Sequence, residues 1–219
     1  MPNLTFKKNK TTGELHVNLE TERLYIESVT TAYLYDYANL LGNPDVMTKF
    51  GDGKAWDFDY TKNRVGTWVE RWNANDPFSS LSISKNDDDN FIGHVVLGYG
   101  DEPGQAEIAY VFDKSTWGHG YGKEAVSAVV NEYAPELIRQ DYQVKGKDFT
   151  SITATARPDN EASVRILKSV GMKPIREEVK YGHNRQVFFM GTDELRKELP
   201  KEPAKMEEIK QPHLNNNKI

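Results

Sequence analysis

Three glycines at alternate positions constrain this chain more than any other feature of its sequence. Gly118, Gly120 and Gly122 follow an apolar segment, residues 107–112, and precede a run of helix-forming residues. Glycine lacks a Cβ atom, so successive backbone N–H groups can turn toward one anion, and the positive end of a following helix dipole attracts the same charge. The pattern predicts a strand, an anion-binding turn and a helix in direct succession, well suited to a pyrophosphate.

The spacing of this turn disfavours two common nucleotide-binding motifs. A Walker loop needs Gly at position 117 and Ser or Thr at 124, where the chain has Trp117 and Glu124. A dinucleotide fingerprint needs Gly at position 123, which is Lys123. ATP and NAD are therefore poor candidates, and a tight turn that binds no ligand stays open as the structural alternative.

Composition narrows the classes of partner. The 219 residues include 28 Lys plus Arg against 33 Asp plus Glu, a net charge of -5, so we expect neither nucleic acid nor a membrane as partner. The absence of Cys excludes disulfides and thiolate nucleophiles, and the start of the chain has no signal-like apolar run. These features favour a soluble, cytoplasmic protein. No group of His and carboxylate residues has metal-ligand spacing, so we expect no metal.

No linker or repeat divides the interior, so we expect a single mixed α/β domain over residues 21–190. Residues 1–20 form an N-terminal extension, read as a possible hairpin that turns at Gly13. Residues 191–219 form a polar tail, with a short helix at most and a frayed end at 215–219.

Hydrophobic periodicity and turn residues predict the order of elements within that domain. Trp68 and Trp72 recur at helical spacing and are interpreted as core. The expected elements are a strand at 23–29, a helix to Gly42, a helix at 61–72, an antiparallel meander at 78–84, 91–99 and 107–112, a helix at 120–134 that Pro135 ends or kinks, a polar connector at 140–148, a strand at 151–156, a helix from Asn160 to Gly171 whose buried stripe is Ala162, Ile166, Leu167 and Val170, and strands at 173–181 and 186–190 around a turn at 182–184.

The segment Trp117-Gly118-His119-Gly120-Tyr121-Gly122 resembles the acyl-coenzyme A loop of the GNAT acetyltransferase superfamily, written Q/R-x-x-G-x-G/A, with Trp at the Gln/Arg position. With Glu124-Ala125 it is similar to the branch that contains the ribosomal-protein alanine N-acetyltransferases. Other segments resemble that branch in the same order: Arg23-Leu24, residues 43–47, residues 91–94, Glu107-Ile108 and residues 160–172. The resemblance covers about residues 21–190.

The resemblance implies a GNAT-like fold: a mixed, mostly antiparallel sheet with flanking helices, in which two parallel strands ending near Phe112 and Ala156 splay apart. It also implies acetyl-CoA as acyl donor in the resulting cleft. Asn160 and Ser163 would face the pantetheine arm and the thiol, although Asn160 also suits a helix cap and Ser163 local packing. The implied cofactor-binding residues are Tyr110, Val111, Phe112, Trp117, Gly118, His119, Gly120, Tyr121, Gly122, Lys123, Asn160 and Ser163.

Acetyl transfer to an amine needs a base, a stabilised oxyanion and a proton for the leaving thiolate. Glu107 is the candidate base, with a surface strand residue as the alternative reading. A backbone N–H near Val111 would meet the oxyanion, and Ser163 would return the proton, with Tyr110 as a less favoured acid. Because the chain has no Cys to hold an acyl group, direct attack in a ternary complex is expected.

The acceptor is expected to be a primary amine, either a protein N-terminus or a small amine, and the net negative charge favours a cationic one. Trp56, Tyr181 and His183 are the candidate acceptor contacts, with a merely exposed turn as the alternative for His183. His94 is read as packed rather than catalytic. A non-catalytic acyl-CoA-binding module is the alternative function, and a homodimer is possible.

Two departures from the branch are visible in the sequence. Ala109 stands where Gly often follows the Glu-Ile pair, and the connector 140–148 is longer than usual. We expect the connector to cover or extend one side of the site.

Overall fold

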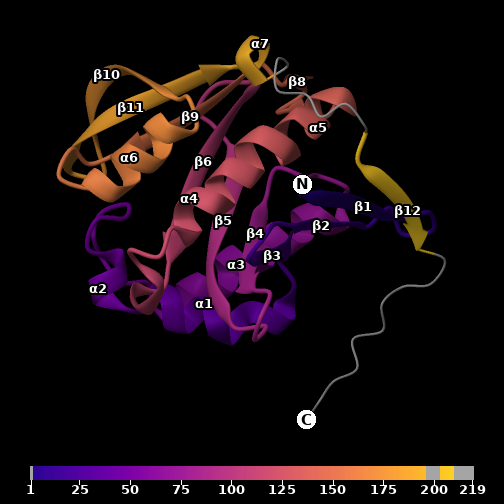
Figure 1. Cartoon of the computed structure of the whole chain (residues 1–219), viewed down its shortest axis with the longest axis horizontal. Coiled ribbons are helices and arrows are strands. Elements are labelled where there is room, and N and C mark those ends of the chain that lie inside the picture. The colour runs from indigo at the N-terminus through magenta and orange to yellow at the C-terminus, as the bar shows by residue number, and fades with distance from the viewer. Residues whose placement is uncertain (1, 196–202, 210–219) are drawn as a thin grey trace.

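One ten-stranded sheet runs through the computed structural model, which describes residues 2–195 and 203–209 (Figure 1). The strands of this sheet are β1 (Asn3–Asn9), β2 (Leu15–Glu20), β3 (Leu24–Ser28), β4 (Ser80–Lys85), β5 (Phe91–Tyr99), β6 (Gln105–Phe112), β9 (Ser151–Ala156), β10 (Lys173–Lys180), β11 (His183–Gly191) and β12 (Lys205–Ile209). Their order across the sheet is β10-β11-β9-β6-β5-β4-β3-β2-β1-β12. Neighbours are antiparallel except for the β6–β9 and β1–β12 pairs, which are parallel. The expected mixed, mostly antiparallel sheet is confirmed.

Helical segments cover both faces of the sheet. They are η1 (Thr31–Tyr33), α1 (Leu34–Leu41), α2 (Pro44–Met47), α3 (Phe58–Asn73), η2 (Lys114–Thr116), α4 (Tyr121–Ala128), the π-helical η3 (Val129–Tyr133), α5 (Ala134–Arg139), α6 (Glu161–Ser169) and α7 (Thr192–Leu195). On one face Tyr110 of β6 contacts α6, and on the other the His94 ring of β5 lies 5.5 Å from the Trp68 ring of α3. Trp68 and Trp72 are each 2% exposed, so the prediction that they belong to the core is confirmed.

The two parallel central strands stay paired for only three residues. Gln105, Ala106 and Glu107 of β6 lie in register with Ser151, Ile152 and Thr153 of β9, and no further pair joins the two strands in the described chain. Beyond Glu107, β6 continues to Phe112 along β5 alone. The predicted splay is therefore present, and it leaves one edge of β6 open.

A glycine lets β5 approach this open region closely. Gly93 lies in register with Phe112 and has a φ of +154°, at a register shift between β4 and β5. A Cβ atom placed on Gly93 would lie 2.3 Å from the Val111 backbone oxygen, so a side chain cannot be accommodated without a backbone shift. The predicted hairpin at Gly13 is also confirmed, because β1 and β2 pair antiparallel on either side of it.

The helix predicted at 120–134 does not end or kink at Pro135 but continues to Arg139. The change occurs earlier, in η3, where the Ala134 N–H bonds to the Val129 oxygen, five residues back. Proline has no N–H and so cannot join a regular helical ladder, but in the first turn of α5, after a π-turn, its N–H is not needed. The prediction missed this because a π-turn has no short-range sequence signature.

The connector 140–148 does not reach the site. It forms a small hairpin of β7 (Gln143–Val144) and β8 (Lys147–Asp148), which is tied to the turn before β6 by a bond from the Gly104 N–H to the Val144 oxygen (3.0 Å). That turn lies at the opposite end of β6 from the glycine loop. The expectation that the connector covers or extends one side of the site is wrong.

Two other expectations change near the C-terminal half. The last hairpin turns at Tyr181 and Gly182, both with positive φ (57° and 76°), so His183 begins β11 instead of lying in the turn. The short helix is α7, but the tail also contributes β12, which pairs with β1. The frayed end expected at 215–219 lies outside the described residues.

Candidate active site

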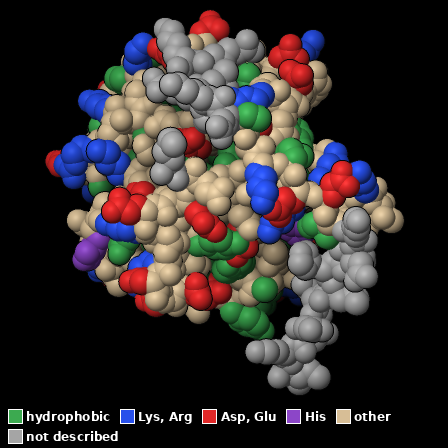
Figure 2. Space-filling view, turned by 45° about the vertical axis from the view of Figure 1, so that its right-hand side comes forward, with side chains coloured by type: hydrophobic (Ala, Val, Ile, Leu, Met, Phe, Trp, Pro, Cys, Tyr) green, Lys and Arg blue, Asp and Glu red, His purple; other side chains and the backbone are tan. Residues whose placement is uncertain are grey.

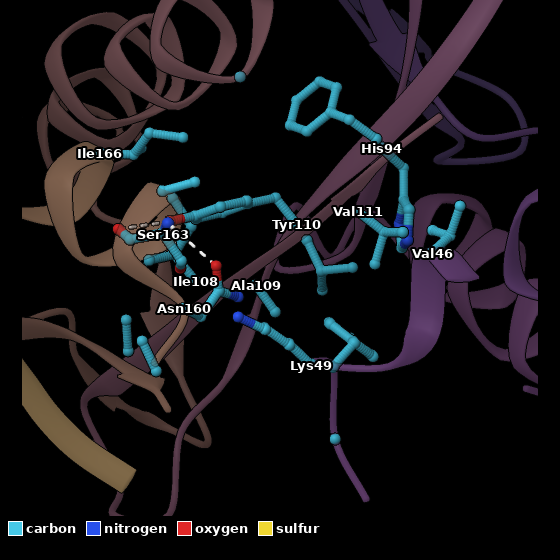
Figure 3. Close-up of a pocket in the computed structure, with 18 of the residues that line it drawn as sticks. Val46, Lys49, His94, Ile108, Ala109, Tyr110, Val111, Asn160, Ser163 and Ile166 are labelled. Carbon is cyan, nitrogen blue, oxygen red and sulfur yellow. Dashed lines mark hydrogen bonds between the residues drawn. The ribbon is translucent and has the colours of Figure 1, made fainter. Parts of the chain in front are cut away.

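A cleft of about 1760 Å³ opens where β6 leaves β9 (Figure 3). It is lined by the segment after α2, by α3, β5, β6, the glycine loop, β9, α6 and residues of the β10–β11 hairpin. A drug-sized ligand usually occupies a pocket of roughly 300 to 1,000 Å³. The cleft is therefore large enough to hold two substrates side by side.

The glycine loop lines the cleft and is fixed at both of its ends. The Trp117 indole N–H donates to the Phe112 oxygen (2.9 Å), which fixes the loop to the end of β6. Gly120 has a φ of +84° and precedes α4, whose first bond runs from the Glu124 N–H to the Gly120 oxygen (3.1 Å). The N–H groups that precede this bond have no acceptor within the helix, so they can bind an anion.

An ion pair between Arg23, which precedes β3, and Glu124 of α4 fixes the other side of the loop. Glu124 accepts from the Thr21 hydroxyl (2.6 Å), the Arg23 N–H (3.0 Å) and two guanidinium nitrogens of Arg23 (2.6 and 2.7 Å). Arg23 also donates to the His119 oxygen (3.0 Å) and lies over the Tyr121 ring (4.6 Å). We call these five residues the Arg23–Glu124 clamp. It neutralises the one carboxylate in the first turn of α4, which would otherwise repel an anion.

Glu107 lies where the β6–β9 pairing stops, and it lines the cleft. Burial raises the pKa of its carboxyl, and the Lys180 ammonium, 3.6 Å away, opposes that rise. A carboxyl with a raised pKa is a stronger proton acceptor than an exposed one. Glu107 therefore lines the cleft with a raised pKa, and Lys180, which the sequence did not single out, is its charged neighbour.

Tyr110 and Ser163 form a hydroxyl pair across the cleft (Figure 3). The two hydroxyl oxygens are 2.8 Å apart, and the Tyr110 hydroxyl also reaches the Ser163 backbone oxygen at 3.2 Å. Burial raises the pKa of Tyr110 to about 12, although the bond to Ser163 works against this shift. Asn160 accepts from the Ser163 N–H (3.3 Å), so its capping role is real, and it also lines the cleft.

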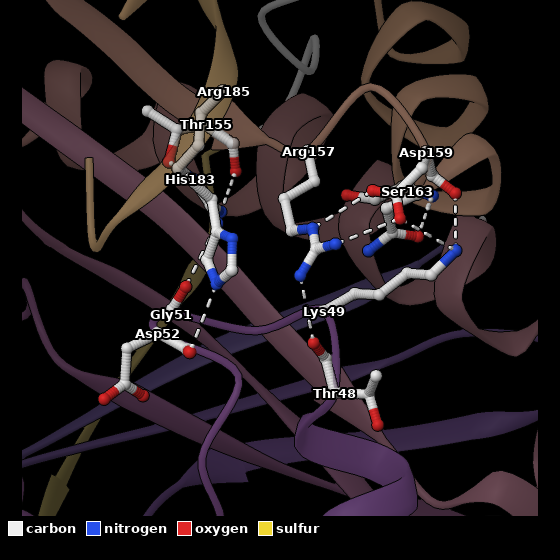
Figure 4. A network of polar contacts seen from close by, with 11 residues as sticks. Thr48, Lys49, Gly51, Asp52, Thr155, Arg157, Asp159, Ser163, His183 and Arg185 are labelled. Carbon is white, nitrogen blue, oxygen red and sulfur yellow. Dashed lines mark hydrogen bonds and ion pairs between the residues drawn. The ribbon is translucent and has the colours of Figure 1, made fainter. Parts of the chain in front are cut away.

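A polar network ties the segment after α2 to the start of α6 at the mouth of the cleft (Figure 4). Arg157 bonds both Asp159 carboxylate oxygens (3.1 Å each) and the Thr48 oxygen (3.3 Å), while Lys49 donates to the Asp159 backbone oxygen (2.5 Å). On the β11 side, the His183 ring lies 3.3 Å from the Asp52 oxygen. These contacts join the segment after α2 to both the start of α6 and the start of β11.

The structure brings most of the predicted site residues to the cleft. His119 and His183 are not among its lining residues: His119 belongs to the clamp through its backbone, and His183 is held by Asp52. His94 is 1% exposed, and burial lowers its pKa to about 3, so the packed reading holds although the residue borders the cleft. The predicted residues that do line the cleft are Trp56, Glu107, Tyr110, Val111, Phe112, Trp117, Gly118, Gly120, Tyr121, Gly122, Lys123, Asn160, Ser163 and Tyr181.

The predicted buried stripe of α6 is only half correct. Leu167 and Val170 are buried, but Ala162 is exposed and Ile166 half-buried, and both line the cleft. Helical periodicity identifies an apolar face without showing whether protein or a ligand-sized space lies against it. Here the face is divided between the two.

Residues 2–195 and 203–209 contain neither a membrane-spanning helix nor a cluster of metal-ligating side chains. No helix in these ranges combines the length and the apolar character needed to cross a membrane. Within the same ranges, no three His, Asp or Glu side chains are grouped so that they could hold a metal ion.

Comparisons with known proteins agree with this geometry. The family model described as an acetyltransferase (GNAT) domain matches residues 23–173. An uncharacterized N-acetyltransferase of Bacillus subtilis, YnaD, is 26% identical over 160 residues, 72% of this chain and 83% of the relative.

Solved structures resemble the fold. A ribosomal-protein-S5-alanine acetyltransferase from Vibrio fischeri superposes with a TM-score of 0.64 at 16% identity, over 81% of this chain and 98% of the other. A spermidine N-acetyltransferase from Vibrio cholerae, in complex with CoA and spermine, superposes with a TM-score of 0.61 at 13% identity, over 80% and 99%. At these identities the likeness concerns the fold alone. The family match covers more than half of the sequence, and the chain belongs to the GNAT acetyltransferase family.

Proposed function

We propose that this protein is an N-acetyltransferase that moves an acetyl group from acetyl-CoA to a primary amine by direct attack in a ternary complex. The observation that carries the proposal is the continuity of the cleft, which runs from the anion-binding loop along the open edge of β6 to Glu107. A donor with a phosphate at one end and a thioester at the other fits that path. The membership of the GNAT family supports the same donor.

The chain's own groups suit each part of the donor. N–H groups at the start of α4, with Lys123 beside them, would bind the pyrophosphate. The unpaired edge of β6 after Glu107 would bond the pantetheine amides as an added strand does. Ala162 and Ile166 of α6 give the opposite wall an apolar surface for the methylene groups.

In the reaction the acceptor nitrogen must lose two protons and the leaving thiolate must gain one. Glu107, directly or through water, takes a proton from the ammonium form of the acceptor, and the free amine attacks the thioester carbonyl to form the N–C bond. The C–S bond breaks as the tetrahedral intermediate collapses. A backbone N–H near Val111 meets the oxyanion. As the intermediate collapses its nitrogen loses a second proton to water, and the Ser163 hydroxyl gives its proton to the leaving thiolate. Ser163 recovers a proton from Tyr110, 2.8 Å away, which water then reprotonates. The products are an acetamide and coenzyme A.

Two acceptor classes follow from the resembling proteins and are proposals for this chain: a protein N-terminus, as the V. fischeri enzyme's name implies for itself, or a small amine such as a polyamine. The half-buried Trp56 and the exposed Tyr181 line the cleft where such an acceptor would enter. The amine panel used to test turnover therefore includes both peptides with a free N-terminus and small amines.

The test separates binding from turnover. Acetyl-CoA binding is measured by calorimetry for the natural chain, for Gly120→Trp, and for Gly146→Trp as a matched control, because Gly146 also has a positive φ (72°) but lies in the β7–β8 turn. We expect binding to be lost only in Gly120→Trp. Thiol release with an amine panel should then fall strongly in Glu107→Gln while acetyl-CoA still binds.

Three outcomes are informative. No acetyl-CoA binding by the natural chain would refute the proposal. Binding without thiol release from any amine would favour a non-catalytic acyl-CoA-binding module. Full turnover by Glu107→Gln would retain the acetyltransferase but remove Glu107 as its base.

A further inference from the structure

The charges that line the cleft are not balanced. Every lining carboxylate except Asp57 has a lysine or arginine within ion-pair distance, and Asp57 caps α3 by accepting from the Tyr60 N–H (2.7 Å). By contrast Arg64, Arg71 and Arg185 line the cleft and have no carboxylate partner among the residues described. The arginines that α3 and β11 contribute to the cleft therefore add positive charge that no carboxylate of the described residues pairs with.

The overall charge of the protein does not predict this local charge. The net charge is -5, and on the face that Figure 2 displays acidic and basic side chains are interspersed. The acidic surplus argued for a cationic acceptor, but a substrate in the cleft meets the lining residues at closer range than the outer surface. The charge of the cleft lining is thus a better guide to the charge of the acceptor than the net charge of the protein is.

Two of the three arginines donate hydrogen bonds to other parts of the protein. Arg185 donates to the Thr155 hydroxyl and backbone oxygens (2.8 Å each) and to the Gly51 oxygen (3.4 Å), which joins β11 to β9 and to the segment after α2. Arg71 donates to the Phe78 oxygen (2.7 Å) and lies over a tyrosine ring. Both side chains donate hydrogen bonds to backbone oxygens, so they stabilise the fold whether or not a ligand is bound.

Arg64 makes no comparable hydrogen bond within the described chain. Its guanidinium lies over the Trp68 ring at 5.1 Å, and no hydrogen-bond acceptor in the described chain reaches it, so its buried Nε has no partner. The neighbouring His94 is 1% exposed; its Nδ1 lies 3.1 Å from the Ser80 hydroxyl, while its Nε2 also has no partner. Buried nitrogens without partners are costly and uncommon. Both residues line the cleft and both lie against the Trp68 ring, at 5.1 Å for the Arg64 guanidinium and 5.5 Å for the His94 ring, so the two unpartnered nitrogens indicate a missing acceptor atom in this part of the cleft.

The position of this pair relative to Glu107 follows from strand register. His94 lies opposite Val111, and Gly98 lies opposite Glu107, on the same face of the β5–β6 pair because the spacing is even. Four strand positions correspond to roughly 13 Å. His94 therefore lies roughly 13 Å along the sheet from the position opposite Glu107, so a ligand that reaches both residues needs a chain of several bonds between its two ends.

We propose that Arg64 and His94 form a subsite for the carboxylate of the amine acceptor, which binds the Arg64 guanidinium with the His94 Nε2–H as a second donor, while the amine lies at the thioester, within reach of Glu107 directly or through water. The inference rests on the proposed function, because Glu107 marks the place of the amine. It narrows the acceptor to a chain with an amine at one end and a carboxylate several bonds away, such as an ω-amino acid or a short peptide, and disfavours polyamines.

The test uses a pair of probes that differ only in the carboxylate. 6-Aminohexanoate and hexylamine are titrated by calorimetry into the full chain saturated with CoA, which also keeps carboxylates out of the phosphate loop. Charge-assisted hydrogen bonds predict an affinity about tenfold or more higher for 6-aminohexanoate. Arg64→Met, which keeps the helix-forming stem, should abolish that preference. Arg165→Met is the matched control, since Arg165 also lines the cleft but is paired with Glu161 at 3.2 Å.

A preference for 6-aminohexanoate that disappears in Arg64→Met and persists in Arg165→Met supports the subsite. Equal affinity for the two probes in the natural chain, or a preference that survives Arg64→Met, overturns it. If Arg64→Met does not fold, Arg64→Lys replaces it and should keep only part of the preference. Because the readout is binding without turnover, a protein that releases no thiol with any amine would sink the proposed function in a separate assay.

Discussion

The Arg23–Glu124 clamp allows a quantitative prediction for the substitution Glu124→Gln. This change keeps the size of the side chain and one acceptor oxygen, but it removes the charge that four donor contacts at 2.6 to 3.0 Å share. The Glu124 side chain is 18% exposed and that of Arg23 is 43% exposed, so water screens the pair in part. Charged hydrogen bonds are worth about 1.5–3 kcal/mol each when buried, and exposed ion pairs about 0–1 kcal/mol.

We therefore expect Glu124→Gln to lower the free energy of unfolding by about 2 kcal/mol, a value between those limits. For a domain of this size that corresponds to a fall in Tm of about 4–8 °C. Thr21→Val, which removes one neutral donor to the same carboxylate, is the matched control and should cost about half as much. Thermal unfolding is followed by circular dichroism, and acetyl-CoA binding by calorimetry.

The loss of stability in Glu124→Gln should also depend on pH. Burial alone would raise the pKa of Glu124, but hydrogen bonds from Thr21 and Arg23 hold it below its usual value of 4.5. A carboxyl with a lowered pKa stabilises the fold above the unfolded pKa and loses that contribution as the pH falls through the folded one. The difference in Tm between the natural chain and Glu124→Gln should therefore be complete at pH 7 and shrink below about pH 4.5.

Acetyl-CoA binding should weaken about three- to tenfold in Glu124→Gln, because Arg23 no longer holds the His119 carbonyl and the loop N–H groups lose their common direction. An unchanged Tm would show that solvent screening removes the value of the clamp. Tighter acetyl-CoA binding would show that the freed Arg23 contacts the phosphates itself, which would contradict the positioning role given to it here.

Three further predictions concern the reaction. Glu107→Gln should lower kcat about 100-fold without weakening acetyl-CoA binding, as measured by thiol release and calorimetry; a loss of both would indicate a structural role instead. Lys180→Met should move the acid limb of the kcat/KM pH profile upward, because removing the ammonium lets burial raise the pKa of Glu107 further, and an unmoved limb would remove Glu107 from the rate. Ser163→Ala should lower kcat at least tenfold and Tyr110→Phe less, since Ser163 can also be reprotonated by water; the reverse order would make Tyr110 the acid.

The features predicted well from the sequence are those that a short segment specifies by itself. The β6 strand, the loop with Gly118 and Gly120 and the start of α4 occupy consecutive positions, so apolar content and glycine spacing suffice to place them. The β10–β11 hairpin was found for the same reason, although its turn was placed one residue late. Local chemistry determines such elements, and reading it requires no knowledge of distant contacts.

The features that the sequence did not reveal depend on contacts between distant segments. Arg23 and Glu124 both belonged to motifs noticed in the sequence, yet nothing there shows that a carboxylate bonds a guanidinium 101 residues away. Lys180 meets Glu107 only because β10, β11 and β9 stack beside β6. Arg64 looks like any exposed helical arginine until the wall that faces it is known.

Strand β12 affects how the protein folds as well as how it is built. Its parallel pairing with β1 sets Thr5 beside Lys205, so this contact closes a loop that spans nearly the whole described chain. Loop closure of that length is entropically costly and is repaid only after the intervening sheet has formed, so the β1–β12 pair should assemble last. Until residues 205–209 are synthesised, β1 has an open edge that can pair with another nascent chain. A delay before β12 pairs would therefore produce aggregation first at the open edge of β1.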